Sequence, residues 1–224
     1  MKEGVQAVDL GLPSGLKWAS CNVGATRPEE FGDYFAWGET EPYYQDGYAY
    51  KVNALWKPGK EYGYYWMSYR WCYGGYDSLN KYNDSYSSGT TVDGLTTLTA
   101  DDDPARAVMG DGWRTPTRAD WEELLNPSKC IWTCTAIKGV PGYTVTSYTT
   151  GNYIFLPAAG FRDEEKISNP ADDGTIGYYW SSTRSADPWQ ACSLFFVDEK
   201  DGGGIFLRDN DRCKGYSVRP VYGK

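Results

Sequence analysis

The sequence predicts an α+β fold with two or three short helices and an antiparallel sheet. The chain has 26 glycines and 12 prolines among 224 residues, so it turns often, which disfavours long helices. One segment, 117–125, has the signals of a capped helix. After residue 143, runs rich in Val, Ile, Tyr and Phe are separated by turn residues, a pattern typical of strands. We expect a single domain over residues 1–224, because no repeat or linker is visible.

The N-terminal part predicts two strands and the start of a helix. Residues 5–12 and 16–19 have the composition of strands, with a Pro13-Ser14-Gly15 turn between them. Residues 26–31 predict a short helix, because two acidic residues fall in its first turn, where the helix dipole favours negative charge.

A long insertion is predicted next, at about 43–97. Residues 43–90 are dominated by Tyr, Gly, Ser and Asn and show neither a strand nor a helix period. A disordered segment would contain fewer aromatic residues, so we expect aromatic packing to hold the insertion in place. Residues 98–107 then predict a short capped helix.

The clearest helix begins after Thr117. Thr117 and Asp120 have the spacing of a capping box, and apolar residues at 121, 124 and 125 share one face. Asn126-Pro127 ends the helix, because a residue before proline avoids helical geometry. The remaining pattern predicts strands at 143–147, 153–156, 178–182, 190–198, 205–208 and 216–221.

Composition excludes several classes of function. The chain contains no histidine, which removes Ser-His-Asp and Cys-His catalysis and histidine-bearing zinc sites. Thirty acidic against 22 basic residues give a net charge of −8, so no nucleic-acid partner is expected. No run of about 18 apolar residues is present, so no membrane insertion is expected. Residues 1–4 lack the apolar core of a signal peptide, which fits a mature or trimmed part of an exported protein.

The six cysteines give only weak signals. Cys130 and Cys134 are separated by three residues with no histidine near them, a poor zinc or redox motif. Cys192 and Cys213 both fall among the C-terminal strands and are candidates to face each other. The even count fits an oxidising compartment, and free buried thiols fit the other four cysteines equally well.

Acidic groups are the candidates for metal binding and catalysis. Ca²⁺ is a possible cofactor at 101–103 or 209–211, although negative charge at a helix N-terminus also explains the first group. Residues 198–204 fit a hairpin turn better than a calcium loop, because a lysine occupies a ligand position. The adjacent pairs 122–123 and 164–165 diverge by about 100° on a helix and do not converge on one bond. No active site is predicted, and the protein is not expected to be an enzyme.

Seven motifs follow one another along residues 6–222: VDLGLPSG (8–15), WASCNVGA (18–25), GDYFAWGE (32–39), GWRTPT (112–117), IFLPAAG (154–160), GYYWSS (177–182) and SVRPV (217–221). In this order they resemble the Fibrobacter succinogenes major paralogous domain family. This family is abundant in exported proteins of gut bacteria and is related to the C-type lectin-like fold. The resemblance implies that N- and C-terminal strands pair, that Trp113, Trp180 and Arg219 belong to the scaffold, and that the protein is extracellular or on the cell surface.

The resemblance also implies a ligand-binding region at 183–214. Related lectin-like proteins display ligand contacts there, and in some of them a diversity-generating retroelement varies this stretch. Five positions match the family framework: Ala191, Leu194, Phe196, Arg212 and Gly215. The candidate ligand-binding residues around them are Arg184, Asp187, Trp189, Phe206, Arg208, Asp209, Asn210, Asp211 and Lys214. Phe195 and Phe206 alternatively pack inward through strand alternation.

We therefore expect a non-enzymatic ligand-binding or adhesion module, tethered to a larger surface protein or pilus, for example as a tip adhesin. Its partner would be a host or bacterial surface protein or a glycan, and a glycan predicts stacking on Trp189. The calcium motifs of sugar-binding lectins, Glu-Pro-Asn and Gln-Pro-Asp, are absent, and 209–211 only resembles their Trp-Asn-Asp element. The alternatives are a structural or assembly domain, or an oxidase like the formylglycine-generating enzymes, with Cys192 and Cys213 holding copper.

Overall fold

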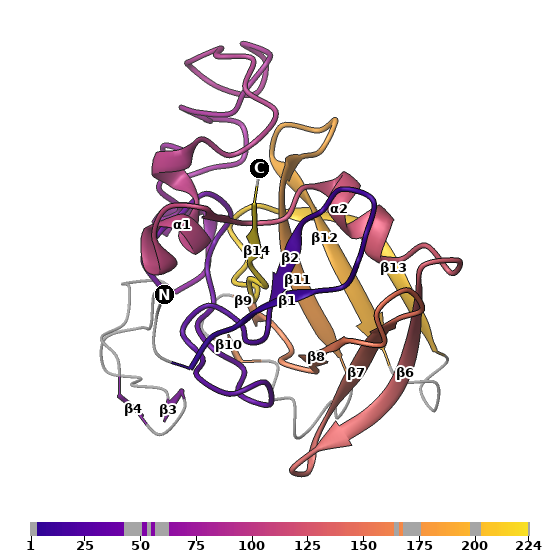
Figure 1. The fold of residues 1–224 in the computed structure, drawn as a ribbon. Coiled ribbons are helices and arrows are strands. Elements are labelled where there is room, and N and C mark those ends of the chain that lie inside the picture. The colour runs from indigo at the N-terminus through magenta and orange to yellow at the C-terminus, as the bar shows by residue number, and fades with distance from the viewer. Residues whose placement is uncertain are drawn as a thin grey trace.

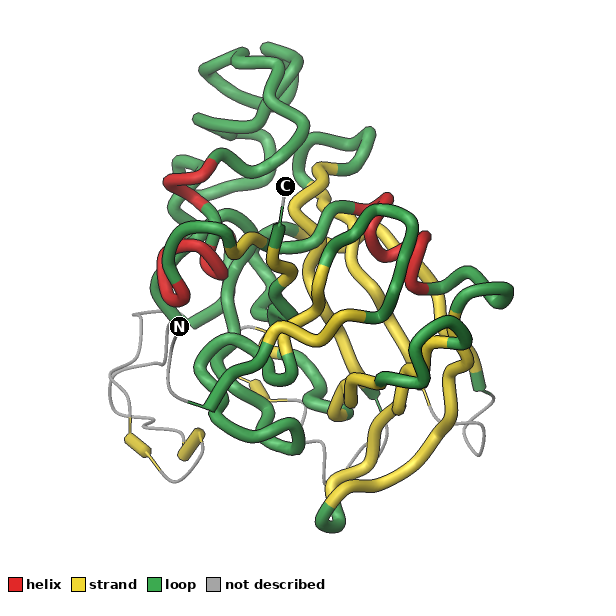
Figure 2. The backbone as a smooth tube through the Cα atoms, viewed as in Figure 1, coloured by secondary structure: helices red, strands yellow, loops and turns green. Residues whose placement is uncertain are grey.

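The computed structural model describes residues 4–42, 51–52, 55–56, 63–163, 166–167, 176–197 and 203–223. These residues form mostly antiparallel strands with two short α-helices, as expected for the α+β class (Figures 1 and 2). The helices are α1 (Pro104–Met109) and α2 (Arg118–Leu124), with 3-10 turns η1 (Trp66–Ser68) and η2 (Ala100–Asp102). The strands are β1 (Ala7–Asp9), β2 (Lys17–Ala19), β3 (Lys51–Val52), β4 (Leu55–Trp56), β5 (Trp113–Arg114), β6 (Cys130–Ile137), β7 (Val140–Ser147), β8 (Tyr153–Pro157), β9 (Arg162–Asp163), β10 (Lys166–Ile167), β11 (Gly177–Arg184), β12 (Gln190–Val197), β13 (Gly204–Asp211) and β14 (Val221–Tyr222).

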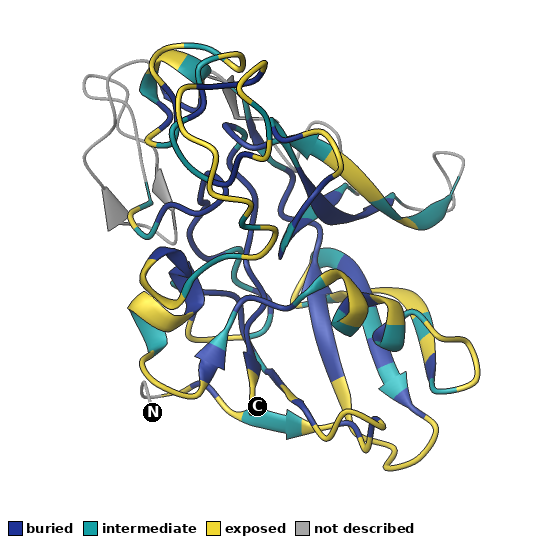
Figure 3. Cartoon of the chain, turned by 90° about the horizontal axis from the view of Figure 1, so that it is seen from above, coloured by how far each residue is buried: buried dark blue, intermediate teal, exposed yellow. Residues whose placement is uncertain are grey.

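Three sheets surround the main core. Their strand orders are β1-β2-β14-β5, β6-β7-β8 and β11-β12-β13. Apolar residues from all three sheets and from α2 form one buried cluster, so the sheets and the helix are stabilised by burying the same apolar surface. Seen from above, the buried strands occupy the middle of the molecule, and exposed residues gather in the peripheral loops (Figure 3). The largest side chains of the cluster are Trp18, Trp121, Tyr143, Tyr179 and Phe196.

The two ends of the chain meet in the first sheet. Strand β14 pairs with β2 through Val221 and Trp18, and β2 pairs in turn with β1. The N- and C-terminal strands therefore share a sheet, with β2 between β1 and β14. The predicted turn is present as well: the amide of Gly15 donates to the carbonyl of Leu12, and Gly15 has a φ of 71°. This left-handed conformation favours glycine.

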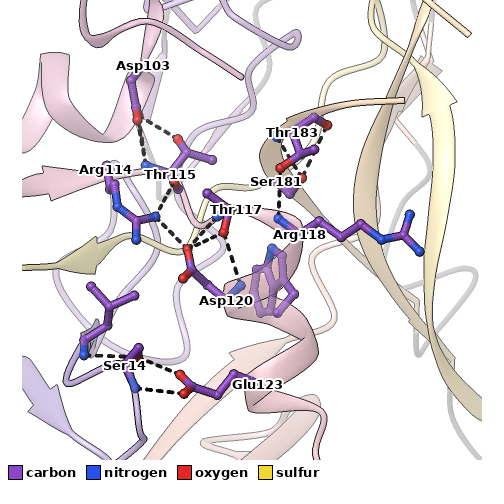
Figure 4. A network of polar contacts seen from close by, with 12 residues as sticks. Ser14, Asp103, Arg114, Thr115, Thr117, Arg118, Asp120, Glu123, Ser181 and Thr183 are labelled. Carbon is purple, nitrogen blue, oxygen red and sulfur yellow. Dashed lines mark hydrogen bonds and ion pairs between the residues drawn. The ribbon is translucent and has the colours of Figure 1, made fainter. Parts of the chain in front are cut away.

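The predicted helix α2 is confirmed with its cap. The Thr117 hydroxyl accepts from the Asp120 amide, and the Asp120 carboxylate accepts from the Thr117 amide at 2.7 Å. The Asp120 carboxylate also pairs with Arg114 of β5 at 2.6 Å, which attaches the helix to the first sheet (Figure 4). Trp121 and Leu124 are fully buried, as the helical pattern predicted.

The predicted helix at 98–107 is divided in two. Asp103 has extended backbone between η2 and α1 and caps α1, its Oδ1 accepting from the Ala105 amide at 2.9 Å. The same carboxylate accepts from the amide and hydroxyl of Thr115, so α1 is fixed to the segment between β5 and α2 (Figure 4).

The predicted helix at 26–31 is wrong. The segment forms a turn, in which the Glu30 carboxylate accepts from the amides of Thr26 and Arg27 at 2.8 and 3.2 Å. An acidic side chain that closes a turn in this way competes with the backbone hydrogen bonds of a helix.

Glu30 gives this turn a pH dependence. Burial acts to raise the pKa of Glu30, but hydrogen bonds from Thr26 and Arg27 outweigh it and hold the pKa below its usual range. A carboxyl whose pKa is lowered on folding stabilises the protein above its unfolded pKa, and this stabilisation is lost as the pH falls through the folded pKa. Urea unfolding of wild type and Glu30→Gln is therefore expected to show wild type more stable at neutral pH, with the difference shrinking on acidification. A difference that does not change with pH would contradict this assignment.

Strand β6 was not predicted, and several strands are longer than expected. The predicted strands at 5–12 and 216–221 are shorter, because only Ala7–Asp9 and Val221–Tyr222 form strands there. In β6 most residues are exposed, and threonines interrupt its apolar positions, so the sequence shows no alternation. Strand β6 is instead stabilised by its pairing with β7 along the full length of both strands, which the local sequence pattern does not reveal.

The structure describes residues 63–97 of the predicted insertion, whereas most of 43–62 lies outside the described residues. The described part stands beside the turn between β11 and β12 (Figure 1). Tyr64, Tyr69 and Leu79 are buried in an apolar cluster, and Tyr82 packs edge-on against Trp37 at 4.9 Å. Aromatic packing therefore holds 63–97 against the rest of the domain.

Candidate functional site

The sheet β11-β12-β13 positions most of the predicted ligand-binding residues. In the register, Tyr178 is opposite Phe195, and Phe195 is opposite Phe206. Neighbouring positions alternate between the two faces of a sheet. Tyr179, Leu194 and Phe196 face the main core, so Tyr178, Phe195 and Phe206 lie on the opposite, outer face.

Three predicted residues meet on this outer face: Phe206, Arg208 and Asn210. The Arg208 guanidinium lies 4.1 Å from the ring centre of Phe195 and 5.4 Å from that of Phe206. The Asn210 side-chain amide donates to the Ser193 hydroxyl of β12 at 2.9 Å. We call the group Tyr178, Phe195, Phe206, Arg208 and Asn210 the outer patch.

Phe206 is the exposed ring of the outer patch. It is 47% exposed, so the alternative that it packs inward is wrong. Phe195 is buried, but beneath Arg208 and beside Tyr178, whose ring centre is 4.8 Å away. A Cβ added to Gly204 would lie 2.2 Å from the Phe206 ring, so the missing side chain at 204 leaves room for this ring.

Arg208 gives the outer patch a positive charge. Among the described residues, Arg208 is exposed and forms no ion pair. Burial raises the pKa of Tyr178 while the Arg208 charge opposes that rise, so the two side chains are electrostatically coupled and the tyrosine stays neutral at physiological pH. The patch therefore offers aromatic surface beside an available guanidinium.

Asp209 and Asp211 alternate with the outer-patch residues along β13. The side chains of Asp209 and Asp211 therefore lie on the face of the sheet opposite the outer patch. Asp211 and Trp189 line a hollow of about 200 Å³ together with Trp66 and Tyr76 of the insertion. We call these four residues the Trp189 hollow. Sequence reasoning missed Trp66 and Tyr76 because their segment has no period that assigns a face.

The remaining predicted residues lie elsewhere. Arg184 was expected to be exposed, but it is buried and pairs with Asp84 of the insertion at 2.6 Å, because residues 83–97 cover the end of β11. Lys214 forms an ion pair with Asp163 of β9. Asp187 is exposed in the turn between β11 and β12. The nine candidates therefore do not form one surface.

The predicted framework is buried. Trp113, Trp180 and Arg219 are each at most 3% exposed, and Ala191, Leu194, Phe196, Arg212 and Gly215 are buried as well. Arg212 donates to the carbonyls of Pro188 and Lys81 at 2.7 and 3.0 Å and to the Tyr69 hydroxyl at 2.9 Å. It thereby attaches the insertion to the β11-β12 turn.

Four of the acidic candidates serve structural roles. Asp102 accepts from Lys81 and Tyr82, and Asp103 caps α1. Glu123 accepts from the amide and the hydroxyl of Ser14 (Figure 4). Glu122 instead pairs with Arg118, so these two acids have different partners and do not converge, as predicted. No group of three metal-ligating side chains is found among the described residues, and 164–165 and 198–202 lie outside them.

The six cysteines are free thiols. Cys192 lies near Ser181 and Arg118, whereas Cys213 belongs to the apolar cluster of Tyr34 and Tyr64. Burial raises the pKa of Cys192 to about 11 and that of Cys213 further, so both stay protonated at neutral pH. Their different surroundings do not support the expectation that they face each other.

Comparisons with known protein families, with curated proteins and with solved structures found no match to this chain. Among its described residues, no helix is both long enough and apolar enough to cross a bilayer.

Proposed function

We propose that this protein is an extracellular or cell-surface binding module of C-type lectin-like fold, a member of the Fibrobacter succinogenes major paralogous domain family. It binds a host or bacterial surface protein or a glycan through the outer patch and catalyses no reaction. The observation that carries the proposal is the exposed Phe206 beside Arg208 on a three-stranded sheet, with no ion pair on Arg208 among the described residues.

The outer patch has the composition of an energetic centre in an interface. Arginine and aromatic residues dominate such centres, because they combine large contact area with directed hydrogen bonds. The stacking of Arg208 on Phe195 and the bond from Asn210 to Ser193 hold these side chains before a ligand arrives. Less conformational freedom is therefore lost on binding.

Three features support the lectin-like fold. N- and C-terminal strands share a sheet, α2 packs against the sheet that carries the outer patch, and the motif residues Trp113, Trp180 and Arg219 are buried. The patch residues vary in chemistry over a buried framework, an arrangement that suits diversification by a retroelement and tethering as a pilus or surface-protein tip. The second candidate, an assembly domain, would use the same patch against a neighbouring domain. An oxidase is the weakest candidate, because Cys192 and Cys213 lie in different surroundings.

We expect Arg208→Ala and Phe206→Ala to weaken ligand binding by about tenfold or more each, the size typical of central interface residues. The ligand is first identified by screening the purified domain against a glycan array and against bacterial and host surface proteins. Titration calorimetry then measures the Kd of each variant for that ligand. Tyr73→Ala is the matched control, because Tyr73 is 71% exposed and lies in the insertion. Equal Kd values for wild type and both patch variants would remove the outer patch from the site.

A further inference from the structure

We infer that the Trp189 hollow binds a small organic cation of the substituted ammonium class. This inference goes beyond the proposed function, because none of the four residues of the hollow belongs to the outer patch. Trp189 was expected to offer a platform for a sugar, but the structure places it among other rings.

The rings of the hollow form a corner. The centres of Trp66 and Tyr76 are 6.4 Å apart with planes at 63°, and those of Tyr76 and Trp189 are 6.1 Å apart with planes at 67°. Rings inclined so steeply present their faces in different directions. A compact, rounded group can therefore contact several faces at once, whereas a flat sugar ring needs one open face.

Asp211 adds a negative charge at the edge of this corner. Within the described part of the chain, its carboxylate accepts one weak hydrogen bond, from the Gln190 side-chain Nε2 at 3.3 Å, and forms no ion pair. The neighbouring cations are already engaged. Lys214 pairs with Asp163, and the Arg212 guanidinium is buried and bonded to carbonyls and to Tyr69. Asp211 is therefore available to balance a positive ligand.

The two features favour the same ligand chemistry. The face of an aromatic ring attracts a cation, and substituted ammonium groups are recognised by several such faces together. A carboxylate within a few ångströms adds Coulomb attraction that a neutral ligand does not gain. The three aromatic residues of the hollow are half-buried or exposed, and Tyr76 is 56% exposed, so a ligand can reach the hollow from solvent.

Titration calorimetry with choline chloride tests the inference, using the whole protein in sodium phosphate buffer, which contains no organic cation. 3,3-Dimethyl-1-butanol has the same shape as choline without the charge. We expect choline to bind with a millimolar Kd and the neutral isostere to bind at least about tenfold more weakly. Equal binding of the two compounds, or no choline binding up to roughly 50 mM, would overturn the inference. Saturable binding of methyl glycosides without choline binding would overturn it in favour of a sugar site.

Two variants locate the site. Asp211→Asn keeps the shape of the side chain and removes its charge, and Tyr76→Ala removes an exposed ring, so neither is expected to unfold the protein. Each is expected to weaken choline binding about fivefold or more. Asp209→Asn, two residues away on β13, is the matched control and should leave the Kd unchanged. Phe206→Ala should also leave it unchanged, which separates this site from the proposed function. Choline binding that is insensitive to both Asp211→Asn and Tyr76→Ala would overturn the assignment.

Discussion

Arg219→Ala is expected to destabilise the whole domain by about 4 kcal/mol or more. Arg219 is fully buried and donates to the Asn22 side chain and to the carbonyls of Ala19 and Phe155, at 2.9, 3.0 and 2.8 Å. Its removal leaves three buried acceptors without a donor, each costing about 1–3 kcal/mol, and a cavity as well. Because these acceptors lie in β2, in the segment that follows it and in β8, their loss affects the main core. Urea unfolding at equilibrium measures the change.

Two further variants make this prediction specific. Arg219→Lys keeps the charge but cannot reach three acceptors at once, so it should lose at least about 2 kcal/mol. Arg27→Ala removes a guanidinium that is 62% exposed and should cost less than about 1 kcal/mol, although it also forms ion pairs. Similar losses for Arg219→Ala and Arg27→Ala would show that Arg219 is not a structural centre.

Arg212→Ala is expected to release the insertion while the main core stays folded. Arg212 joins Tyr69 and Lys81 of the insertion to Pro188, and its guanidinium lies 4.9 Å from the Trp37 ring. Losing these bonds should cost about 3 kcal/mol locally, which corresponds to roughly hundredfold faster amide exchange over 63–97. Hydrogen–deuterium exchange read by mass spectrometry gives this quantity by segment.

The control for Arg212 lies in the same segment. Arg70 is exposed, and its guanidinium stacks on Trp71 at 4.7 Å, so Arg70→Ala should change exchange over 63–97 by less than about fivefold. Unchanged exchange in Arg212→Ala, or equal acceleration throughout the chain, would contradict a local role. Choline binding should weaken in Arg212→Ala, because Trp66 and Tyr76 reach the hollow only when the insertion is docked.

The elements that the sequence predicted well are those with local signals. The capping box at Thr117 and the strand-forming runs at 190–198 and 205–208 depend on near neighbours, and the structure confirms them over its described residues. The turn at 26–31 was predicted as a helix because acidic residues are favourable both in the first turn of a helix and in an isolated turn. Only the observed bonds from Glu30 to Thr26 and Arg27 decide between them.

The site depended on contacts that no local pattern reveals. Phe206 and Arg208 were named from the resemblance to lectin-like proteins, and the structure leaves both side chains exposed on β13. The burial of Arg184 could not be predicted, since it depends on Asp84, 100 residues away. The same holds for the hollow, where Tyr76 of an aperiodic segment meets Trp189. Long-range packing of the insertion therefore determines which candidates are available to a ligand.

Amide exchange of the protein, alone and with a saturating ligand from the array or surface-protein screen, tests the binding role of the outer patch most directly. We expect slower exchange on binding to be strongest in β12 and β13, because four of the five patch side chains, including the exposed Phe206 and Arg208, project from these two strands. Protection at the β6–β7 hairpin or in 63–97, with β12 and β13 unchanged, would contradict the proposed function.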